Sequence, residues 1–341
     1  MQWGRPVNVA EGEIIHWGKL LFERHLISGW GGNLSCRLGK NEFLITGQHA
    51  PLGFLTAKDV VRISGDGKPI TGKQHASSET PMHLAVYRGT EAQAIVHVHP
   101  PAVLAFSLTR ESFLPVSFEE KYTIGNVPII PQDTPTVTKP DKLVQELKFH
   151  PVVILKGHGT VACGKNLQEA FLLTDLLEEA VHCQFLKERL STAPLTGAAA
   201  DEGPDGQASA PGAPGTCYVL FSKEHMTALV TVANRDTRFR DEGRETGLST
   251  SLTLLLEETD TPWTVRFVAG EITELDQESN GEFMISGTRE WWSAVFNNRM
   301  DPFFATQQGK LKLQRGELAK LSQWYKPFER AFSLWQKIPI Q

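Results

Sequence analysis

Three histidines lie at spacings that suit a bound metal ion. His97 and His99 occur in the segment AIVHVHP. Because side chains alternate along a strand, both imidazoles would lie on one face and could bind a single ion. His158 follows the apolar run VVIL and lies between two glycines, which allow close backbone approach. Three histidines with one open coordination position are typical of a catalytic zinc site. The alternatives are a hydrogen-bonded surface pair and a plain loop histidine.

Glu79 is the candidate acid or base. It follows Ser77-Ser78 and precedes Thr80-Pro81. This pattern is typical of a helix start, where free backbone N–H groups favour an anion and proline suits the first turn. The carboxylate could equally be a helix-capping group. His83, four residues later, would share a helix face with Glu79, and we interpret it as structural.

Alternating helical and strand-like segments must position these residues. Helical periodicity covers residues 11–28, where Gly29, Gly31 and Gly32 should end the helix, and it returns at 81–88 and 167–190. Short apolar runs bounded by turn residues predict strands at 42–46, 94–98, 127–130 and 152–155. This alternation predicts an α/β domain with one central β-sheet over residues 1–190.

A second domain is expected after residues 191–216, which are dominated by Ala, Gly, Pro, Ser and Thr and should form a flexible linker. Downstream, at 217–341, we expect an α+β domain. Its predicted strands are 218–221, 228–232, 264–269, 282–286 and 310–314, and its predicted helices are 250–257, 288–297 and 317–335.

The composition limits the classes of function. A chain of 341 residues with 40% hydrophobic content is long enough for two cores. A net charge of −5 leaves no basic excess, so no nucleic-acid partner is expected. No apolar run approaches the roughly 18 residues of a transmembrane segment, and the start lacks a secretory pattern. We therefore expect a cytoplasmic protein with a small-molecule substrate. The four cysteines are isolated, which indicates reduced packing residues.

Five motifs in chain order resemble the class II aldolase/adducin family, and the fuculose-phosphate aldolases in particular. They are Gly31-Gly32-Asn33-Leu34-Ser35, Ile45-Thr46-Gly47, Ser77-Ser78-Glu79, His97-Val98-His99 and Gly157-His158-Gly159. The resemblance covers about residues 8–190 and implies a three-layer domain around the central sheet. It also implies one Zn²⁺ per subunit, or another divalent metal, bound by His97, His99 and His158. Glu79 would bind the resting metal and then act as the base.

The same resemblance implies a phosphorylated substrate. Side-chain amides, hydroxyls and a glycine N–H are donors that suit a phosphate, although the residues could be turn and cap residues only. The residues at the family's phosphate-binding positions are Asn33, Thr46, Gly47, Ser77 and Ser78.

The activity implied is that of a zinc-dependent lyase. An aldolase of this kind reversibly cleaves a phosphorylated ketose, or a related hydroxy-ketone, through a metal-stabilised enediolate. The aldolases also use a tyrosine from a neighbouring subunit of a homotetramer. Here SFEEKYTIGN offers Tyr122, unless Phe118 falls at that position. The epimerases of the family have Asp where Glu79 stands and a further Asp where this chain has Glu120 or Lys121, so epimerase fits less well.

The C-terminal region, at about 217–336, is similar to sterol carrier protein 2-like domains. Such a domain implies an apolar ligand in a tunnel, although the aromatic side chains could be ordinary core. The candidate lining residues are Trp291, Trp292, Phe296, Phe303, Phe304 and Trp324.

Three hypotheses follow. The leading one is the aldolase. A decarboxylase or sugar-phosphate epimerase on the same scaffold is the first alternative. A non-catalytic lipid-binding or scaffold protein with a vestigial metal site is the second.

Overall fold

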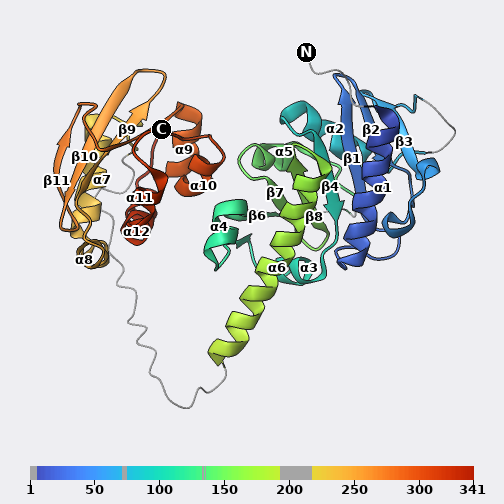
Figure 1. The fold of residues 1–341 in the computed structure, drawn as a ribbon, viewed down its shortest axis with the longest axis horizontal. Helices are drawn as coiled ribbons and strands as arrows, with labels where there is room; N and C mark the ends of the chain where they lie inside the picture. Colours follow the sequence, from blue (N-terminus) through green and yellow to red (C-terminus); the bar gives the residue numbers. More distant parts are fainter. Residues whose placement is uncertain (1–5, 71–74, 133, 135, 193–216) are drawn as a thin grey trace. The chain divides into compact units, whose positions relative to one another are not determined.

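A mixed β-sheet occupies the centre of the N-terminal unit of this computed structural model (Figure 1), which describes residues 6–70, 75–132, 134, 136–192 and 217–341. Within the described part of this unit, eight strands lie in the order β3-β2-β1-β4-β8-β7-β6-β5. Among these strand pairs, only β6–β7 is parallel. The strands are β1 (Asn33–Gly39), β2 (Glu42–Thr46), β3 (Val60–Ser64), β4 (Ala94–Val98), β5 (Ser112–Phe113), β6 (Val127–Ile130), β7 (Val152–Leu155) and β8 (Gly159–Gly164).

Helices cover both faces of this sheet, as the three-layer prediction requires. Side chains on successive strand positions alternate between two cores: Ala94, Val96 and Val98 belong to one, and Ile95 belongs to the other. The first core includes residues of α1 (Val7–Glu23), α3 (Pro101–Ser107), α4 (Phe118–Ile124) and α6 (Leu167–Thr192). The second includes residues of α2 (Thr80–Gly89) and α5 (Asp141–Leu147). Two short 3₁₀ helices, Leu52–Phe54 and Ala57–Asp59, connect β2 to β3.

The strands predicted at 42–46, 94–98, 127–130 and 152–155 are confirmed as β2, β4, β6 and β7. The predicted end of the first helix at the glycines is wrong. α1 stops at Glu23 because His25 adopts a left-handed conformation, with φ of 58°. The N–H of Leu26 then donates to the carbonyl of Leu21 at 2.9 Å, and that of His25 to Phe22 at 3.0 Å. This pair of bonds is a Schellman motif, which ends a helix without a glycine.

The chain divides into two compact units, Met1–Leu195 and Thr196–Gln341. Ser191 and Thr192, expected to begin the linker, end α6 instead, and the remainder of the predicted linker lies outside the described residues. Among the helices that the structure describes, none combines the length and apolar character needed to cross a membrane.

The C-terminal unit has an α+β architecture. Its described residues form a five-stranded sheet in the order β11-β10-β9-β12-β13, in which β9 and β12 are parallel. The strands are β9 (Thr250–Leu256), β10 (Thr261–Val268), β11 (Glu271–Asp276), β12 (Phe283–Gly287) and β13 (Lys312–Arg315). The helices are α7 (Lys223–Arg235), α8 (Thr237–Glu245), α9 (Arg289–Phe296), α10 (Pro302–Gln307), α11 (Leu318–Ser322) and α12 (Tyr325–Trp335).

Several elements predicted for this unit are wrong. In the segment 250–257, predicted as a helix, residues 250–256 form the central strand β9. This strand is buried on both faces and therefore lacks strand-like alternation. Residues 228–232, predicted as a strand, lie inside α7, whose start is capped by Ser222. At 218–221 only Tyr218 forms an isolated bridge, with Ile340. The helix predicted at 317–335 is divided into α11 and α12, because Trp324 leaves helical geometry, with φ of −105° and ψ of 27°.

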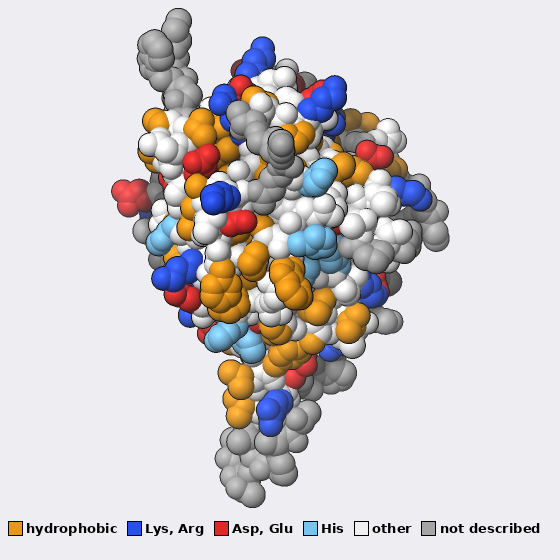
Figure 2. Space-filling model, turned by 90° about the vertical axis from the view of Figure 1, so that its right-hand side faces the viewer, with side chains coloured by type: hydrophobic (Ala, Val, Ile, Leu, Met, Phe, Trp, Pro, Cys, Tyr) orange, Lys and Arg blue, Asp and Glu red, His pale blue; other side chains and the backbone are white. Residues whose placement is uncertain are grey.

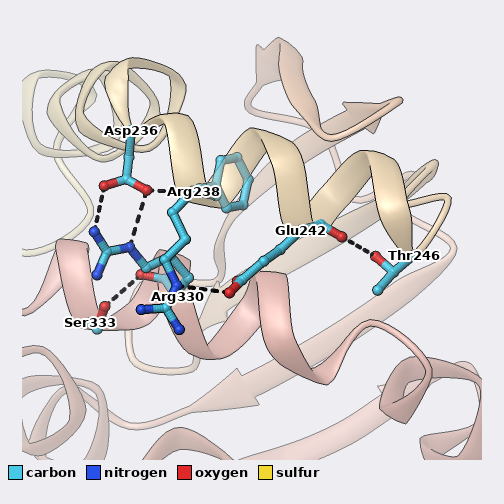
Figure 3. A network of polar contacts seen from close by, with 7 residues as sticks. Asp236, Arg238, Glu242, Thr246, Arg330 and Ser333 are labelled. Atoms are coloured by element: carbon cyan, nitrogen blue, oxygen red, sulfur yellow. Dashed lines mark hydrogen bonds and ion pairs between the residues drawn. The ribbon is translucent and has the colours of Figure 1, made fainter. Parts of the chain in front are cut away.

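An ion pair joins α8 to α12 in this unit (Figure 3). Arg330 donates from Nε and Nη2 to the two carboxylate oxygens of Asp236, at 3.0 and 2.6 Å. Asp236 also caps α8 by accepting the N–H of Phe239 at 2.7 Å. One buried carboxylate therefore fixes both the start of α8 and its packing on α12.

Candidate metal centre

The three candidate metal histidines come together at the ends of strands in the middle of the N-terminal sheet. His97 lies in β4, His99 follows its end, and His158 lies in the turn between β7 and β8. The ring centroids are 4.8 to 5.1 Å apart, and one nitrogen from each ring lies within 4.8 Å of the others. β4 and β8 are paired neighbours in the sheet, so the strand pairing itself brings the distant His158 to the pair.

The donor atoms of these rings fit a cation. His97 Nδ1 lies 2.8 Å from the carbonyl oxygen of Thr160. A carbonyl only accepts, so Nδ1 carries the proton and Nε2 keeps its lone pair, as in metal-binding histidines. His99 Nε2 and His158 Nδ1 are buried and have no hydrogen-bond partner in the described structure. These two partnerless nitrogens and the lone pair of His97 are donors that a divalent metal would satisfy.

The electrostatics also favour neutral imidazoles. Burial lowers the pKa of His99 to about 4 and lowers the pKa of His158. The pKa of His97 lies well below its ordinary value, mainly through burial and further through the neighbouring histidines. At neutral pH all three rings are therefore uncharged, and each has one nitrogen with a free lone pair, which metal binding requires.

Two glycines make room for the rings. A Cβ at Gly31 would stand 2.9 Å from His99 Nδ1. A Cβ at Gly159 would stand 2.3 Å from the carbonyl oxygen of Val98 and 2.6 Å from His99 Cδ2. The close backbone approach expected around His158 is thus present at Gly159, on the side facing His99.

Of the predicted phosphate-binding residues, Asn33 lies beside this cluster, and Thr46 and Ser77 connect to β1 through hydrogen bonds. Asn33 pairs directly with His97 across β1 and β4, so the two side chains lie on the same face of the sheet. Thr46 accepts the N–H of Leu34 through its Oγ1 at 3.2 Å, and its carbonyl accepts the N–H of Ser77 at 3.1 Å. Asn33, Thr46 and Ser77 are buried polar residues brought together by β1, β2 and the segment before α2.

The role of Gly47 at the phosphate site stays a prediction, but its N–H already has a partner in this structure. That N–H already donates to the carbonyl of Asp59 at 2.7 Å. Gly47 also forms an isolated bridge with Ala76, so its backbone aligns the segment that carries Ser77 and Ser78. Ser78 is exposed and differs in this respect from Ser77.

Glu79 occupies the N-cap position of α2, but its side chain does not cap the helix. The carboxylate accepts the N–H of Val137 at 3.4 Å and is 6% exposed. Burial raises the pKa of Glu79, which suits a group that must exchange a proton. Among the described residues, the cluster of close metal-ligand atoms contains the three histidines and not Glu79, so its role as a resting ligand stays a prediction.

A cavity of about 600 Å³ opens beside His99 and His158, within the range of small-molecule sites. Its lining includes Lys156 and Gln132, which the sequence reasoning missed. Lys156 directly precedes the GHG motif and forms an ion pair of 2.6 Å with Glu111. Figure 2 shows histidine and hydrophobic side chains together on one face of the N-terminal unit.

The expected second acid, Tyr122, lies on α4 and is not among the residues that line this cavity. α4 packs against α6 and is capped by Ser117, whose hydroxyl hydrogen-bonds the carboxylate of Glu120. Phe118, the other candidate for this position, is 60% exposed. A role for either side chain in a neighbouring subunit's site stays a prediction.

The aromatic residues of the C-terminal unit form a core with a small cavity. Trp292 and Phe303 line this cavity of about 20 Å³, which has room for roughly one water molecule. Phe296, Phe304 and Trp324 are buried in the surrounding core, and Trp291 is half-buried under Lys310 at 4.4 Å. An apolar ligand would therefore require this core to open.

Comparison with known proteins places this fold and site in one class. Residues 12–185 match the class II aldolase and adducin N-terminal domain, and the chain belongs to this family. It is 32% identical over 179 residues to an L-fuculose phosphate aldolase of Methanococcus maripaludis, covering 52% of this chain and 97% of that protein. It is 30% identical over 184 residues to a 3-oxo-tetronate 4-phosphate decarboxylase of Pectobacterium atrosepticum, covering 52% and 84%. The crystal structure of L-fuculose-1-phosphate aldolase from Thermus thermophilus superimposes with a TM-score of 0.50 at 30% identity, covering 55% and 98%.

Proposed function

We propose that this protein is a metal-dependent lyase of the aldolase type that cleaves a phosphorylated ketose or a related hydroxy-ketone. The observation that carries the proposal is the triad of neutral histidines, in which His97 is buried and His99 and His158 are half-buried, each with a partnerless nitrogen. His99 and His158 line a cavity of about 600 Å³. Asn33, paired with His97 across two strands, puts a buried amide beside that triad. A metal site next to uncharged donors suits a substrate with both a carbonyl and a phosphate.

His97, His99 and His158 would hold the metal, with Glu79 as a further ligand in the resting state. We propose Zn²⁺, one per subunit, because three imidazoles and an open position suit it. When bound, the ion supplies a Lewis acid that polarises the substrate carbonyl. Glu79, with its raised pKa, would take up and return the proton at the carbon next to that carbonyl. Asn33, Thr46, Ser77 and Ser78 would bind the phosphate, with Gly47 aligning them.

A decarboxylase acting on a phosphorylated oxo-acid is the second candidate. Lys156, which is paired with Glu111 at 2.6 Å, lines the cavity beside His158, and its ammonium group would bind a substrate carboxylate in place of Glu111. The 30% identity to a 3-oxo-tetronate 4-phosphate decarboxylase also supports this second candidate. An epimerase on the same scaffold is the weaker form of this alternative.

Substrate turnover separates the candidates. With L-fuculose 1-phosphate, cleavage should release an aldehyde and a three-carbon ketone phosphate. With 3-oxo-tetronate 4-phosphate, a decarboxylase would release carbon dioxide. Carbon dioxide release without aldehyde release from any ketose phosphate would overturn the aldolase, and an inverted stereocentre would indicate the epimerase.

Replacing Glu79 by Gln tests the mechanism. The amide keeps the shape of the side chain but cannot exchange the proton, so turnover should fall by about 10²- to 10⁴-fold. The bound metal and the thermal midpoint should stay close to wild type, measured by atomic emission and calorimetry. Wild-type turnover in the variant would refute the role of Glu79.

Metal analysis tests the alternative of a vestigial site. Purified protein should contain about one equivalent of metal, and replacing His97 and His99 by Ala should remove it, because one remaining imidazole cannot hold the ion. Folded wild-type protein without metal after incubation with Zn²⁺ would favour the non-catalytic lipid-binding or scaffold protein.

For the rest of the chain we propose a linker at 193–216, after the end of α6, and a sterol carrier protein 2-like domain at 217–341. β12, α9 after Thr288, α10 beginning at Asp301-Pro302, β13 and α12 follow one another as that resemblance requires. We also propose a homotetramer in which Tyr122 reaches the active site of a neighbouring subunit. The proposed location is the cytoplasm. Mass measurement in solution checks the first of these.

A further inference from the structure

A buried chain of polar side chains runs behind Asn33, and the proposed mechanism does not use it. Tyr87 Oη lies 2.7 Å from Ser35 Oγ, which lies 2.6 Å from His83 Nδ1. His83 Nε2 lies 2.5 Å from Asn33 Oδ1. The four side chains are between 1% and 6% exposed. Ser35 and Asn33 come from β1 and the other two from α2, so the chain crosses between the sheet and the helix that covers it.

The direction of these hydrogen bonds is fixed by their chemistry. The oxygen of an amide only accepts, so His83 Nε2 carries the proton that binds Asn33 Oδ1. Burial lowers the pKa of His83 to about 3, so the ring has only that one proton at neutral pH. His83 Nδ1 must then accept from the hydroxyl of Ser35, whose oxygen accepts in turn from Tyr87. Every donor in the chain therefore points toward Asn33.

This polarity determines which end of the Asn33 amide meets a ligand. The oxygen is held by His83, and among the described residues Asn33 Nδ2 is paired with no acceptor. Asn33 lies opposite His97 in the sheet, and the N–H of its neighbour Leu34 binds Thr46. The free end of the amide thus carries two N–H donors at the edge of the proposed phosphate site.

We propose that His83 is a positioning residue that locks the Asn33 amide with its N–H donors toward the substrate phosphate. The inference rests on the proposed function, since it assumes a phosphate next to Asn33. Without His83 the amide can rotate by half a turn about its terminal bond. Its oxygen would then face the phosphate, and repulsion would replace a hydrogen bond to a charged group. Ser35 and Tyr87 act on the substrate only through His83.

A double-mutant cycle on the metal-loaded protein tests the proposal, with inorganic phosphate as the probe. The variants are His83→Leu, Asn33→Ala and the double variant, and calorimetric titration gives the Kd for phosphate. We expect His83→Leu to weaken phosphate binding by roughly 10- to 100-fold, the loss expected for one hydrogen bond to a charged group. The double variant should bind no more weakly than Asn33→Ala alone, because His83 acts only through Asn33.

Additive losses in the double variant would overturn the inference, as would wild-type phosphate affinity in His83→Leu. A general structural role would instead lower the metal content and the thermal midpoint, so both are measured alongside. His83→Gln is the conservative control, because its amide can still donate toward Asn33 and should restore most of the affinity.

A failure of the proposed function would give a different result, because the wild-type protein would then not bind phosphate at all. The inference about His83 would fail together with the proposed function. If His83→Leu does not fold, Tyr87→Phe in the same cycle keeps the shape of the core. It should give a smaller loss in the same direction that also disappears in the Asn33→Ala background. A loss that persists in that background contradicts the proposal.

Discussion

Residues around the proposed metal site are packed so closely that an added methyl group would overlap its neighbours. A methyl group at Gly159 would lie within van der Waals overlap of both the Val98 carbonyl and the His99 ring. His99 has no hydrogen bond to hold its Nε2 against such a push. Gly159 thus controls the position of the His99 ring although it is not a candidate ligand itself. Residues next to metal ligands commonly have this effect.

Replacing Gly159 by Ala should therefore weaken metal binding by about 10- to 100-fold, in the range found for residues that support metal ligands. The measurement is a competition titration with a chelator. Gly39→Ala is the matched control, because Gly39 also lies at the end of a strand and a Cβ there meets no atom within 4 Å. Equal metal affinity in both variants would show that the triad tolerates displacement of His99.

His225 gives the C-terminal unit a dependence on pH. The ring is fully buried, its Nδ1 accepts the N–H of Phe221 at 3.2 Å, and burial lowers its pKa to about 4. An unfolded histidine takes up its proton near pH 6.5. Above that pH neither state is protonated, and between 6.5 and 4 only the unfolded state gains the proton, so stability falls as the pH falls.

Lowering the pH from 7 to 5 should thus reduce the free energy of unfolding by about 2 kcal/mol through the protonation of His225 in the unfolded state. Denaturant titrations of the whole protein and of His225→Gln at both pH values measure the difference. The variant should lose less stability than wild type over this interval. The same loss in both proteins would exclude His225 as the source.

At the scale of elements, the ion pair between α8 and α12 is the clearest tertiary constraint in the C-terminal unit. Arg330→Met would leave the Asp236 carboxylate, 7% exposed, without its partner. Removing one member of such a pair typically costs about 3 to 5 kcal/mol, because a buried charge remains uncompensated. Denaturant unfolding of the variant checks this value.

Arg238→Met provides the control from the same network (Figure 3). Arg238 pairs with Glu242 at 2.8 Å but is 64% exposed, so its loss should cost less than about 1 kcal/mol. Similar losses for Arg330→Met and Arg238→Met would mean that burial does not strengthen the pair with Asp236.

Some helices and strands could be predicted from the local sequence pattern alone, and others could not. β2, β4, β6 and β7 were predictable because each is a short apolar run between turn residues. β9 was not, because a central strand buried on both faces has no alternation to distinguish it from a helix. The end of α1 was missed because a histidine, and not a glycine, adopts the left-handed conformation there.

At the scale of the whole molecule, each unit has its own sheet and its own core. The described residues of the N-terminal unit fill two cores, one on each face of its sheet. The C-terminal unit buries its own aromatic residues, including Trp292, Trp335 and Phe328. Units of this size with separate cores generally fold alone.

Residues 1–195 and 217–341, produced as separate chains, should each unfold in one cooperative transition. The N-terminal fragment should keep the metal content of the whole protein, since all three histidines lie within it. Circular dichroism during heating, together with atomic emission, measures both. An N-terminal fragment that loses its metal would show that the C-terminal unit contributes to the site.

The α/β character of the N-terminal unit, its family and the three candidate metal histidines could all be predicted from the sequence alone. These follow from local properties: the two-residue period that aligns His97 with His99, and the glycines around His158. The tertiary structure decided that the Gly47 N–H is occupied, that Lys156 lines the cavity, and that His83 holds Asn33. Those facts depend on pairings between residues that are 12 positions apart, as for Gly47 and Asp59, or 50 positions apart, as for His83 and Asn33, which no local pattern records.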